Sequence, residues 1–369
     1  MKLLVQPGDG IKPLVKAIER AKSSIQIVIF RFDRLEIEKA LEDAVKRGVA
    51  VDALIAFTNR GGEKNLRKLE LRFLDRGVTV ARTADDLVRY HGKMMIIDGK
   101  ELHLLAFNYT QIDIERSRSF AVITHEKELV KEAVRLFDAD SKRRKYKPGS
   151  PRFVVSPLNA RKEISRFIQG AKKELLIYDV KITDREMIQL LEERARAGVE
   201  IRVIGKVARR SSQIAVRRLA KLRLHTRTMV RDGNDIFMGS QSLRELELDS
   251  RREIGIIFRD ADTAKQITKV FETDWKTGVI QTGDEADDIE KPPAAKVAKK
   301  VAKTVTKVLP PVAPVIEDVI KEVVPTENGF DIDHEEIEES VKIAVKQAVK
   351  QAVREAVEDV VEQQREPEA

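Results

Sequence analysis

The sequence contains no cysteine, one tryptophan and no long uninterrupted apolar segment. Without cysteine the chain cannot form disulfides, thiolate zinc sites or a cysteine nucleophile. No segment reaches the roughly 20 uncharged apolar residues that a membrane span requires. The first residues reach Pro7 and Gly8 without a long apolar stretch, unlike a signal peptide. We therefore expect a cytoplasmic protein without a transmembrane segment.

Charge is abundant and unevenly distributed along the 369 residues, whose net charge is +8. The stretch 284–290 and the region from 327 onward are acidic. Residues 1–280 therefore carry roughly twice the positive excess of the whole chain. A basic body of this kind indicates a polyanionic partner, either nucleic acid or an anionic membrane surface. A highly charged, heat-adapted surface would give the same composition.

An internal repeat organises the first 280 residues. A short β-branched run, a stretch with helical spacing, a glycine and a second short run occur twice, at 25–30, 35–47, Gly48 and 51–57, and at 175–178, 184–197, Gly198 and 201–204. Each short run is typical of a buried strand, and each glycine stands where a helix ends. The repeat predicts an α/β fold of two similar halves, each a mixed sheet flanked by helices.

Composition divides the chain into four segments. We predict a first half over 1–148 and a second over 149–280, joined by the basic connection 142–149. A low-complexity Lys/Ala/Val/Pro linker over 281–340 is expected to be flexible. Over 341–364, valine at every fourth position predicts an amphipathic helix. This helix either self-associates or packs on a partner, or it stays marginal and exposed to solvent.

Two of the five histidines occupy equivalent positions in the repeat. A histidine, one residue, a cation, four residues, an aspartate and a glycine occur as His91, Lys93, Asp98 and Gly99, and again as His225, Arg227, Asp232 and Gly233. Side chains alternate along a strand, so each histidine and its cation are expected to face the same side. The duplication indicates a functional site. The remaining histidines, which have no repeat partner, are expected to be structural or superficial: His103, His125 and His334.

The duplicated pattern resembles the HxKxxxxD signature of the phospholipase D superfamily, and the resemblance covers about residues 1–280. The family's downstream GSxN or GSxS element is matched by 239–242, whereas the first half keeps only Asn108. The glutamate that usually follows is matched by Glu253, and the equivalent first-half position is Ser119. The sequence departs from the family pattern at Ser119 and at Arg227, which replaces the second lysine.

The resemblance implies a phosphodiesterase that forms a phosphohistidine and then transfers the group to water or an alcohol, without a metal or another cofactor. One imidazole must be neutral to attack phosphorus, and the other must be protonated to release the leaving alcohol. By resemblance, His91 is the nucleophile and His225 the general acid. Cationic Lys93 and Arg227 would neutralise the phosphate oxygens.

The other matched residues have supporting roles by the same resemblance. The side chains of Asn108 and Ser242 would add hydrogen bonds to the phosphate. Asp98 and Asp232 are expected to hold the loops in place. Glu253 is expected to orient the second-half histidine, and in the first half Glu115 or Asp113 would replace the missing carboxylate.

Three functions remain open at this level. A nuclease is narrowly favoured by the basic body and by the Lys/Ala/Pro tail. A phospholipase D or phosphatidyl transferase would use the same signature on phospholipids. The third function is a catalytically weak nucleic-acid-binding scaffold that assembles through its C-terminal helix, which the altered second motif would suit.

Overall fold

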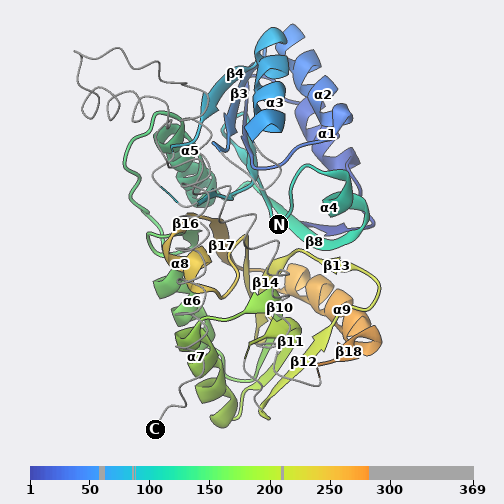
Figure 1. Ribbon diagram of the computed structural model, residues 1–369, viewed down its shortest axis with the longest axis vertical. Coiled ribbons are helices and arrows are strands. Elements are labelled where there is room, and N and C mark those ends of the chain that lie inside the picture. Colours follow the sequence, from blue (N-terminus) through green and yellow to red (C-terminus); the bar gives the residue numbers. More distant parts are fainter. Residues whose placement is uncertain (58–62, 85–86, 88, 209–211, 282–369) are drawn as a thin grey trace, which may run out of the picture. The chain divides into compact units, whose positions relative to one another are not determined.

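The structure is a computed structural model that describes residues 1–57, 63–84, 87, 89–208 and 212–281. The predicted linker and C-terminal helix lie outside these residues, apart from Gln281, so both stay predictions. In Figure 1 the first half runs from blue to teal and the second from green to orange.

The first half is built on a mixed sheet in the order β1-β8-β7-β6-β2-β3-β4. Adjacent strands β2, β3 and β4 are parallel, and the other neighbours are antiparallel. The strands are β1 (Lys2–Gln6), β2 (Ser24–Ile29), β3 (Ala50–Ile55), β4 (Thr79–Arg82), β6 (Met94–Ile97), β7 (Glu101–Leu105) and β8 (Ser117–Thr124).

The second half repeats this arrangement in the order β18-β12-β11-β10-β14-β15-β17-β9. Strands β10, β11 and β12 are parallel, as β2, β3 and β4 are in the first half. The strands are β9 (Phe153–Val155), β10 (Glu174–Ile182), β11 (Glu200–Val207), β12 (Ile214–Arg218), β14 (Arg227–Arg231), β15 (Asp235–Gly239), β17 (Ile254–Arg259) and β18 (Val279–Ile280). The prediction of two similar halves with mixed sheets is confirmed.

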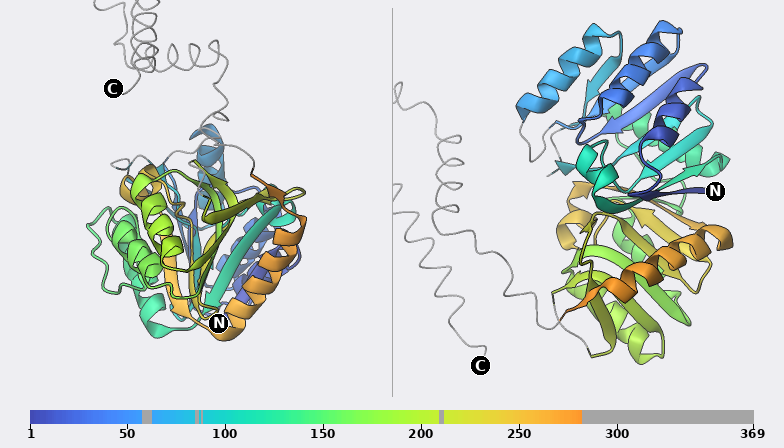
Figure 2. Two further views of the ribbon diagram at one scale, coloured as in Figure 1. Left: turned by 90° about the horizontal axis from the view of Figure 1, so that it is seen from below. Right: turned by 90° about the vertical axis from the view of Figure 1, so that its right-hand side faces the viewer.

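Helices follow the same repeat, and Figure 2 shows them flanking the sheets. They are α1 (Lys12–Glu19), α2 (Leu35–Lys46), α3 (Glu63–Asp75), α4 (Gln111–Glu115), α5 (Lys127–Ser141), α6 (Ala160–Gln169), α7 (Arg185–Arg196), α8 (Glu245–Asp249) and α9 (Ala261–Thr277). After α2 and α7 the backbone turns at Gly48, with φ 84°, and at Gly198, with φ 91°. These left-handed angles explain the glycine at each helix end.

Two short ribbons join the halves. In one, β5 (Arg89–Tyr90) of the first half pairs in parallel with β16 (Arg251–Arg252) of the second. In the other, β13 (Arg223–Leu224) of the second half pairs in parallel with β8 of the first. Each half thus places the residues before its predicted catalytic histidine on a strand of the other half.

An aromatic chain also crosses between the halves. Phe120 of β8 lies with its ring centroid 5.4 Å from that of Tyr178 in β10, and Tyr178 lies 5.1 Å from Phe271 of α9. The ring of Phe271 stacks on Trp275 at 5.7 Å. Edge and offset contacts of this kind add about 0.5–1.5 kcal/mol each beyond burial. Helix α9 therefore fixes the second half against β8, which helps to hold the site between the halves.

None of the helices within the described ranges is long and apolar enough to cross a membrane.

Candidate active site

His91 lies in the short segment between β5 and β6, held by the second half. Its backbone N–H donates to the carbonyl of Arg252 at 2.7 Å. At Gly92, a Cβ atom would come within 2.4 Å of the Ile254 side chain, so glycine lets the segment approach β17 closely. The strand placement expected from sequence is therefore wrong by a few residues, because the cross-half ribbon ends before His91 and β6 begins after Lys93.

His225 occupies the equivalent place in the other half, just before β14. The backbone N–H groups of His225 and Thr226 donate to the carbonyl of Arg118 at 3.0 and 3.1 Å. Arg118 therefore corresponds to Arg252, and the next residue, Ser119, corresponds to Glu253. The match that the sequence predicted between these two positions agrees with this geometry.

Glu253 contacts the first-half histidine. Its Oε2 lies 2.8 Å from Nδ1 of His91, and both groups are buried. The expectation that Glu253 orients the second-half histidine is wrong, because each histidine segment is docked on the opposite half. The carboxylate after β16 therefore reaches His91, and the histidine that lacks a matching glutamate is His225.

Asp113 supplies the carboxylate for His225 instead. Its Oδ2 lies 3.2 Å from Nδ1 of His225, although the alignment is too poor for a hydrogen bond. The same oxygen accepts from the backbone N–H and the side-chain amide of Asn108 at 2.9 and 2.7 Å. The guanidinium of Arg223 binds the other oxygen. Glu115, the alternative expected from sequence, instead pairs with Arg34.

The two motif cations are buried beside the histidines. Nζ of Lys93 lies 2.8 Å from Nε2 of His91, so these side chains face each other as predicted. Arg227 donates through Nε to Oγ of Ser242 at 3.1 Å and through Nη1 to the carbonyl of His225 at 2.6 Å. The charge of Arg227 acts on His91 and that of Lys93 on His225, so the cations, the histidines and Ser242 form one buried polar cluster.

A second pair of acids repeats between the halves, and of this pair the sequence analysis named only Asp113. Five residues after Asn108 stands Asp113, and five residues after Ser242 stands Glu247, which accepts from the Ser242 N–H at 2.8 Å. Arg251 donates to Glu247 at 3.1 Å. The shared spacing would also have predicted Glu247. It could not have found the contacts of the two acids with the arginines, because these depend on the packing of the short helices α4 and α8.

Burial dominates the protonation of the site. Burial lowers the pKa of His91 well below its ordinary value, and the charges of Lys93 and Arg227 lower it further. Burial also lowers the pKa of His225 well below its ordinary value, although Asp113 opposes this. Burial lowers the pKa of Lys93 to about 7 against the opposing charge of Glu253. Both imidazoles are therefore neutral at pH 7 before a ligand binds.

The motif aspartates lie away from the histidines, in turns. Oδ1 of Asp98 accepts from the backbone N–H groups of Ser23 and Ser24 at 2.7 and 3.0 Å. Asp232 does the same for Lys173 and Glu174, at 2.7 and 3.1 Å. Each carboxylate ties the end of a motif strand, β6 or β14, to the start of its antiparallel neighbour, β2 or β10. It therefore orders the sheet and does not touch the cluster.

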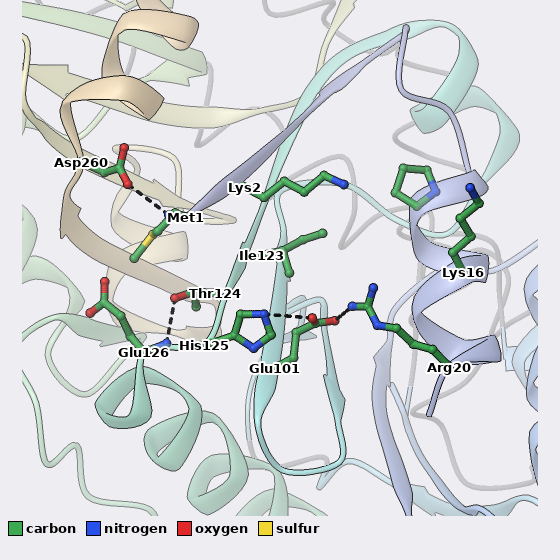
Figure 3. Close-up of a pocket in the computed structure, with 11 residues that line it drawn as sticks. Met1, Lys2, Lys16, Arg20, Glu101, Ile123, Thr124, His125, Glu126 and Asp260 are labelled. Atoms are coloured by element: carbon green, nitrogen blue, oxygen red, sulfur yellow. Dashed lines mark hydrogen bonds and ion pairs between the residues drawn. The ribbon is translucent and has the colours of Figure 1, made fainter. Parts of the chain in front are cut away.

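Two further histidines form a separate group at the start of β7. Nε2 of His103 lies 2.6 Å from Glu101, and the exposed ring of His125 lies 3.2 Å from the same carboxylate. Figure 3 shows Glu101 between His125 and Arg20 in a surface pocket. These contacts agree with the expected structural or superficial roles. His334 lies outside the described residues.

Both halves match one family model. The model described as "Cardiolipin synthase, PLD-like domain" matches residues 14–141 and 164–275. Within these ranges lie both histidines, both cations and Asp113, Ser242 and Glu253.

Individual relatives carry several different names. Polyphosphate kinase of Staphylococcus haemolyticus is 25% identical over 219 residues, which cover 54% of this chain and 30% of that protein. Mitochondrial cardiolipin hydrolase of Danio rerio is 28% identical over 122 residues, 32% of this chain and 51% of that protein. The chain thus spans about half the length of these relatives or less.

Two solved structures share the fold. Polyphosphate kinase from Porphyromonas gingivalis superposes with a TM-score of 0.62 at 20% identity, covering 74% of this chain and 50% of that one. Phosphatidylserine synthase from Haemophilus influenzae Rd KW20 superposes with a TM-score of 0.61 at 12% identity, covering 83% and 93%. At these identities the likeness concerns the fold.

Proposed function

The chain belongs to the phospholipase D superfamily, and on this premise we propose that it is a phosphodiesterase that works through a phosphohistidine on His91. The observation that carries the proposal is the position of His91 between Glu253 and Lys93. With Nδ1–H donating to Glu253, the lone pair lies on Nε2, which faces Lys93. A neutral, oriented imidazole next to a cation is what attack on an anionic phosphodiester requires.

In the first step, Nε2 of His91 forms a bond to phosphorus while the bond to the leaving oxygen breaks. His225 gives its proton to that oxygen, so the product leaves as an alcohol. In the second step, His225 takes a proton from water, and the hydroxide displaces His91 from phosphorus. Glu253 stabilises the positive charge that His91 gains, as a carboxylate does for a catalytic imidazole.

His225 must acquire a proton before the first step, although burial keeps it neutral in the free protein. An anionic phosphodiester placed between the histidines raises the pKa of both. Only His225 has a free role as donor, because His91 Nε2 points at phosphorus. Substrate binding therefore protonates His225, the general acid.

Four side chains would bind the non-bridging oxygens. Lys93 and Arg227 supply charge, and Arg227 already donates to Ser242. The Ser242 hydroxyl also hydrogen-bonds the buried carboxylate of Asp179, so its proton would pass from that carboxylate to a phosphate oxygen when the substrate binds. The Asn108 amide has a second N–H beyond the one given to Asp113. These donors would stabilise charge that develops in the transition state.

We propose nucleic acid as the substrate class, narrowly ahead of phospholipid. The net charge of +8 and the larger positive excess before residue 281 favour a long polyanion. The likeness to a mitochondrial cardiolipin hydrolase favours the phospholipid alternative.

The test is to incubate the protein, in EDTA, with labelled single- and double-stranded DNA and RNA, with mixed phospholipid vesicles and with inorganic polyphosphate. The His91→Ala variant is compared with His125→Ala, which removes an exposed histidine outside the cluster. We expect cleavage of nucleic acid that is lost in His91→Ala and kept in His125→Ala. Cleavage of lipid alone would transfer the proposal to phospholipid, and salt-sensitive binding without turnover of any substrate would support a scaffold.

A further inference from the structure

Behind the β5–β16 ribbon lies a second cavity, of about 490 Å³, which the catalytic scheme does not use. Tyr90 and Arg252 form its wall, and each precedes a member of the His91–Glu253 pair in sequence. The cavity therefore adjoins the two segments that carry the catalytic pair.

The opposite rim carries three consecutive cations, Arg143, Arg144 and Lys145. All three are exposed, and no ion pair joins them to a residue that the structure describes. The acid in the lining, Asp140, is buried and bound by Arg252 at 3.3 Å. The rim therefore holds an excess of positive charge that the described residues leave uncompensated.

Backbone conformation supplies an independent observation. Helix α5 ends in a motif where Arg144 N–H donates to the Ala139 carbonyl at 2.7 Å and Arg143 N–H to the Asp140 carbonyl at 3.3 Å. In this motif the left-handed residue is usually glycine. Here it is Arg143, with φ 53°. An arginine in that strained position indicates that its side chain has a use outside the helix cap.

The connection is also anchored next to the cations. Glu132 of α5 accepts hydrogen bonds from the Tyr146 hydroxyl and the Gly149 N–H. The guanidinium of Arg135 lies 5.8 Å from the Tyr146 ring and also donates to the Lys147 carbonyl. The three cations thus project from a fixed backbone, which lowers the entropy lost on binding.

From these observations we propose that the cavity and its rim of Arg143, Arg144 and Lys145 bind a segment of a nucleic-acid strand next to the one that is cleaved. This deepens the proposed function and rests on it. The cations would contact successive phosphates. Pro157 and the half-exposed Leu158 in the lining offer an apolar surface for a base. A concave site suits an entering strand better than a flat membrane surface.

The test compares two triple variants with equal loss of charge. One is Arg143→Gln/Arg144→Gln/Lys145→Gln, and the control is Lys265→Gln/Lys269→Gln/Lys276→Gln on α9. Binding of a labelled single-stranded oligonucleotide is titrated at several salt concentrations, with His91→Ala added to prevent cleavage. We expect the rim variant to bind about 10- to 100-fold more weakly, whereas the control changes little. The slope of log affinity against log salt concentration should be smaller in magnitude by about 2 in the rim variant.

Activity on bis(p-nitrophenyl) phosphate separates this proposal from the proposed function. That diester is too small to reach the rim, so the rim variant should turn it over at the wild-type rate. If no diester is cleaved by any form, the proposed function fails, yet the binding comparison still decides the site. Equal weakening by both triple variants, or by neither, would overturn the proposal, as would a loss confined to anionic vesicles.

The Arg143→Gly variant distinguishes a ligand-binding role of the Arg143 side chain from a purely structural role. Glycine relieves the left-handed backbone, so the melting temperature should rise while oligonucleotide binding weakens. A lower melting temperature with unchanged binding would mean that Arg143 serves the fold, and the proposal would be wrong.

Discussion

The two halves share a sheet order and a motif, yet they surround their histidines differently. His91 has a buried glutamate at 2.8 Å on one ring nitrogen and Lys93 at 2.8 Å on the other. His225 has Asp113 at 3.2 Å, and its carbonyl, not its ring, contacts Arg227. The tighter setting suits a nucleophile whose ring must stay oriented. The looser one suits an acid that exchanges protons twice in each cycle.

The comparison also shows that the halves depend on each other. Each histidine segment is hydrogen-bonded to a carbonyl of the other half, Arg252 for His91 and Arg118 for His225. The carboxylate partners are consequently exchanged, since Glu253 follows Arg252 and reaches His91. A single half would have a histidine and a cation without the docking strand. Duplication therefore completes the site as well as repeating it.

The largest expected effect is the loss of kcat on replacing either histidine, and the two losses should depend differently on the leaving group. His91→Ala should lose about 10⁴-fold or more in kcat on any diester, because it removes the nucleophile. His225→Ala should lose a similar factor on an alkyl diester, which needs a protonated leaving oxygen. On bis(p-nitrophenyl) phosphate, with a leaving group that needs no acid, its first step should be nearly unchanged. A burst of p-nitrophenol measured by stopped flow checks this.

Equal bursts in both variants would contradict the division of roles. So would a burst in His91→Ala and none in His225→Ala, which would exchange the nucleophile and the acid. His125→Ala is the matched control.

The next effect compares the two carboxylates. Glu253→Gln should reduce kcat by about 10²–10³-fold, because the His91 tautomer and its positive charge both lose support. Asp113→Asn should reduce it by about tenfold, because the longer contact is shared with Arg223. Steady-state kinetics on one diester measure both, with Ser119→Ala as the neutral control. A larger loss of kcat in Asp113→Asn than in Glu253→Gln would contradict the view that His91 depends more on its carboxylate than His225 does.

A smaller effect concerns the unlike cations. Because the pKa of Lys93 is about 7, it loses its charge as pH rises, and kcat/KM should fall about tenfold per pH unit above that value. Lys93→Arg should move this fall upward by more than about two units, since arginine stays charged. Arg227→Lys should add a second fall of kcat/KM at alkaline pH, because a lysine at this position can lose its charge. Identical pH profiles for the wild type and Lys93→Arg would show that deprotonation of Lys93 does not cause the fall of kcat/KM at alkaline pH.

The smallest difference is expected at the turn aspartates. Asp98→Ala and Asp232→Ala should each lower the free energy of unfolding by about 1–2 kcal/mol, because several backbone donors lose their acceptor. Backbone hydrogen bonds hold the pKa of Asp98 at about 2 although burial opposes them. Its contribution is thus complete above about pH 4 and is lost as pH falls through 2. Denaturant unfolding measures both, and a tenfold loss of kcat in folded protein would contradict a purely structural role.

Much of this architecture is encoded locally. The runs 25–30 and 175–178 became β2 and part of β10, and the glycines after α2 and α7 took the expected left-handed angles. Short-range patterns such as alternation and capping determine these features, so a single sequence suffices to predict them.

The exchange of carboxylates could not be predicted, because it depends on contacts between distant segments. No local pattern around His91 predicts its contact with Glu253, which is 162 positions away in the sequence. Asp113 was one of two acids considered, but for the wrong histidine, because its helix faces the docked segment of the other half. Pairing within each half is the simplest reading of a repeat. The ribbons β5–β16 and β8–β13 overturn it.

The most direct test of the account is to identify the phosphorylated residue. His225→Ala is mixed with bis(p-nitrophenyl) phosphate, quenched at alkaline pH, and its peptides are analysed by mass spectrometry. Without His225 to activate water, the intermediate should accumulate, and the mass of one p-nitrophenyl phosphoryl group should appear on the peptide that contains His91. The same mass on another residue, or no modified peptide despite release of p-nitrophenol, would contradict the claim that His91 is the nucleophile.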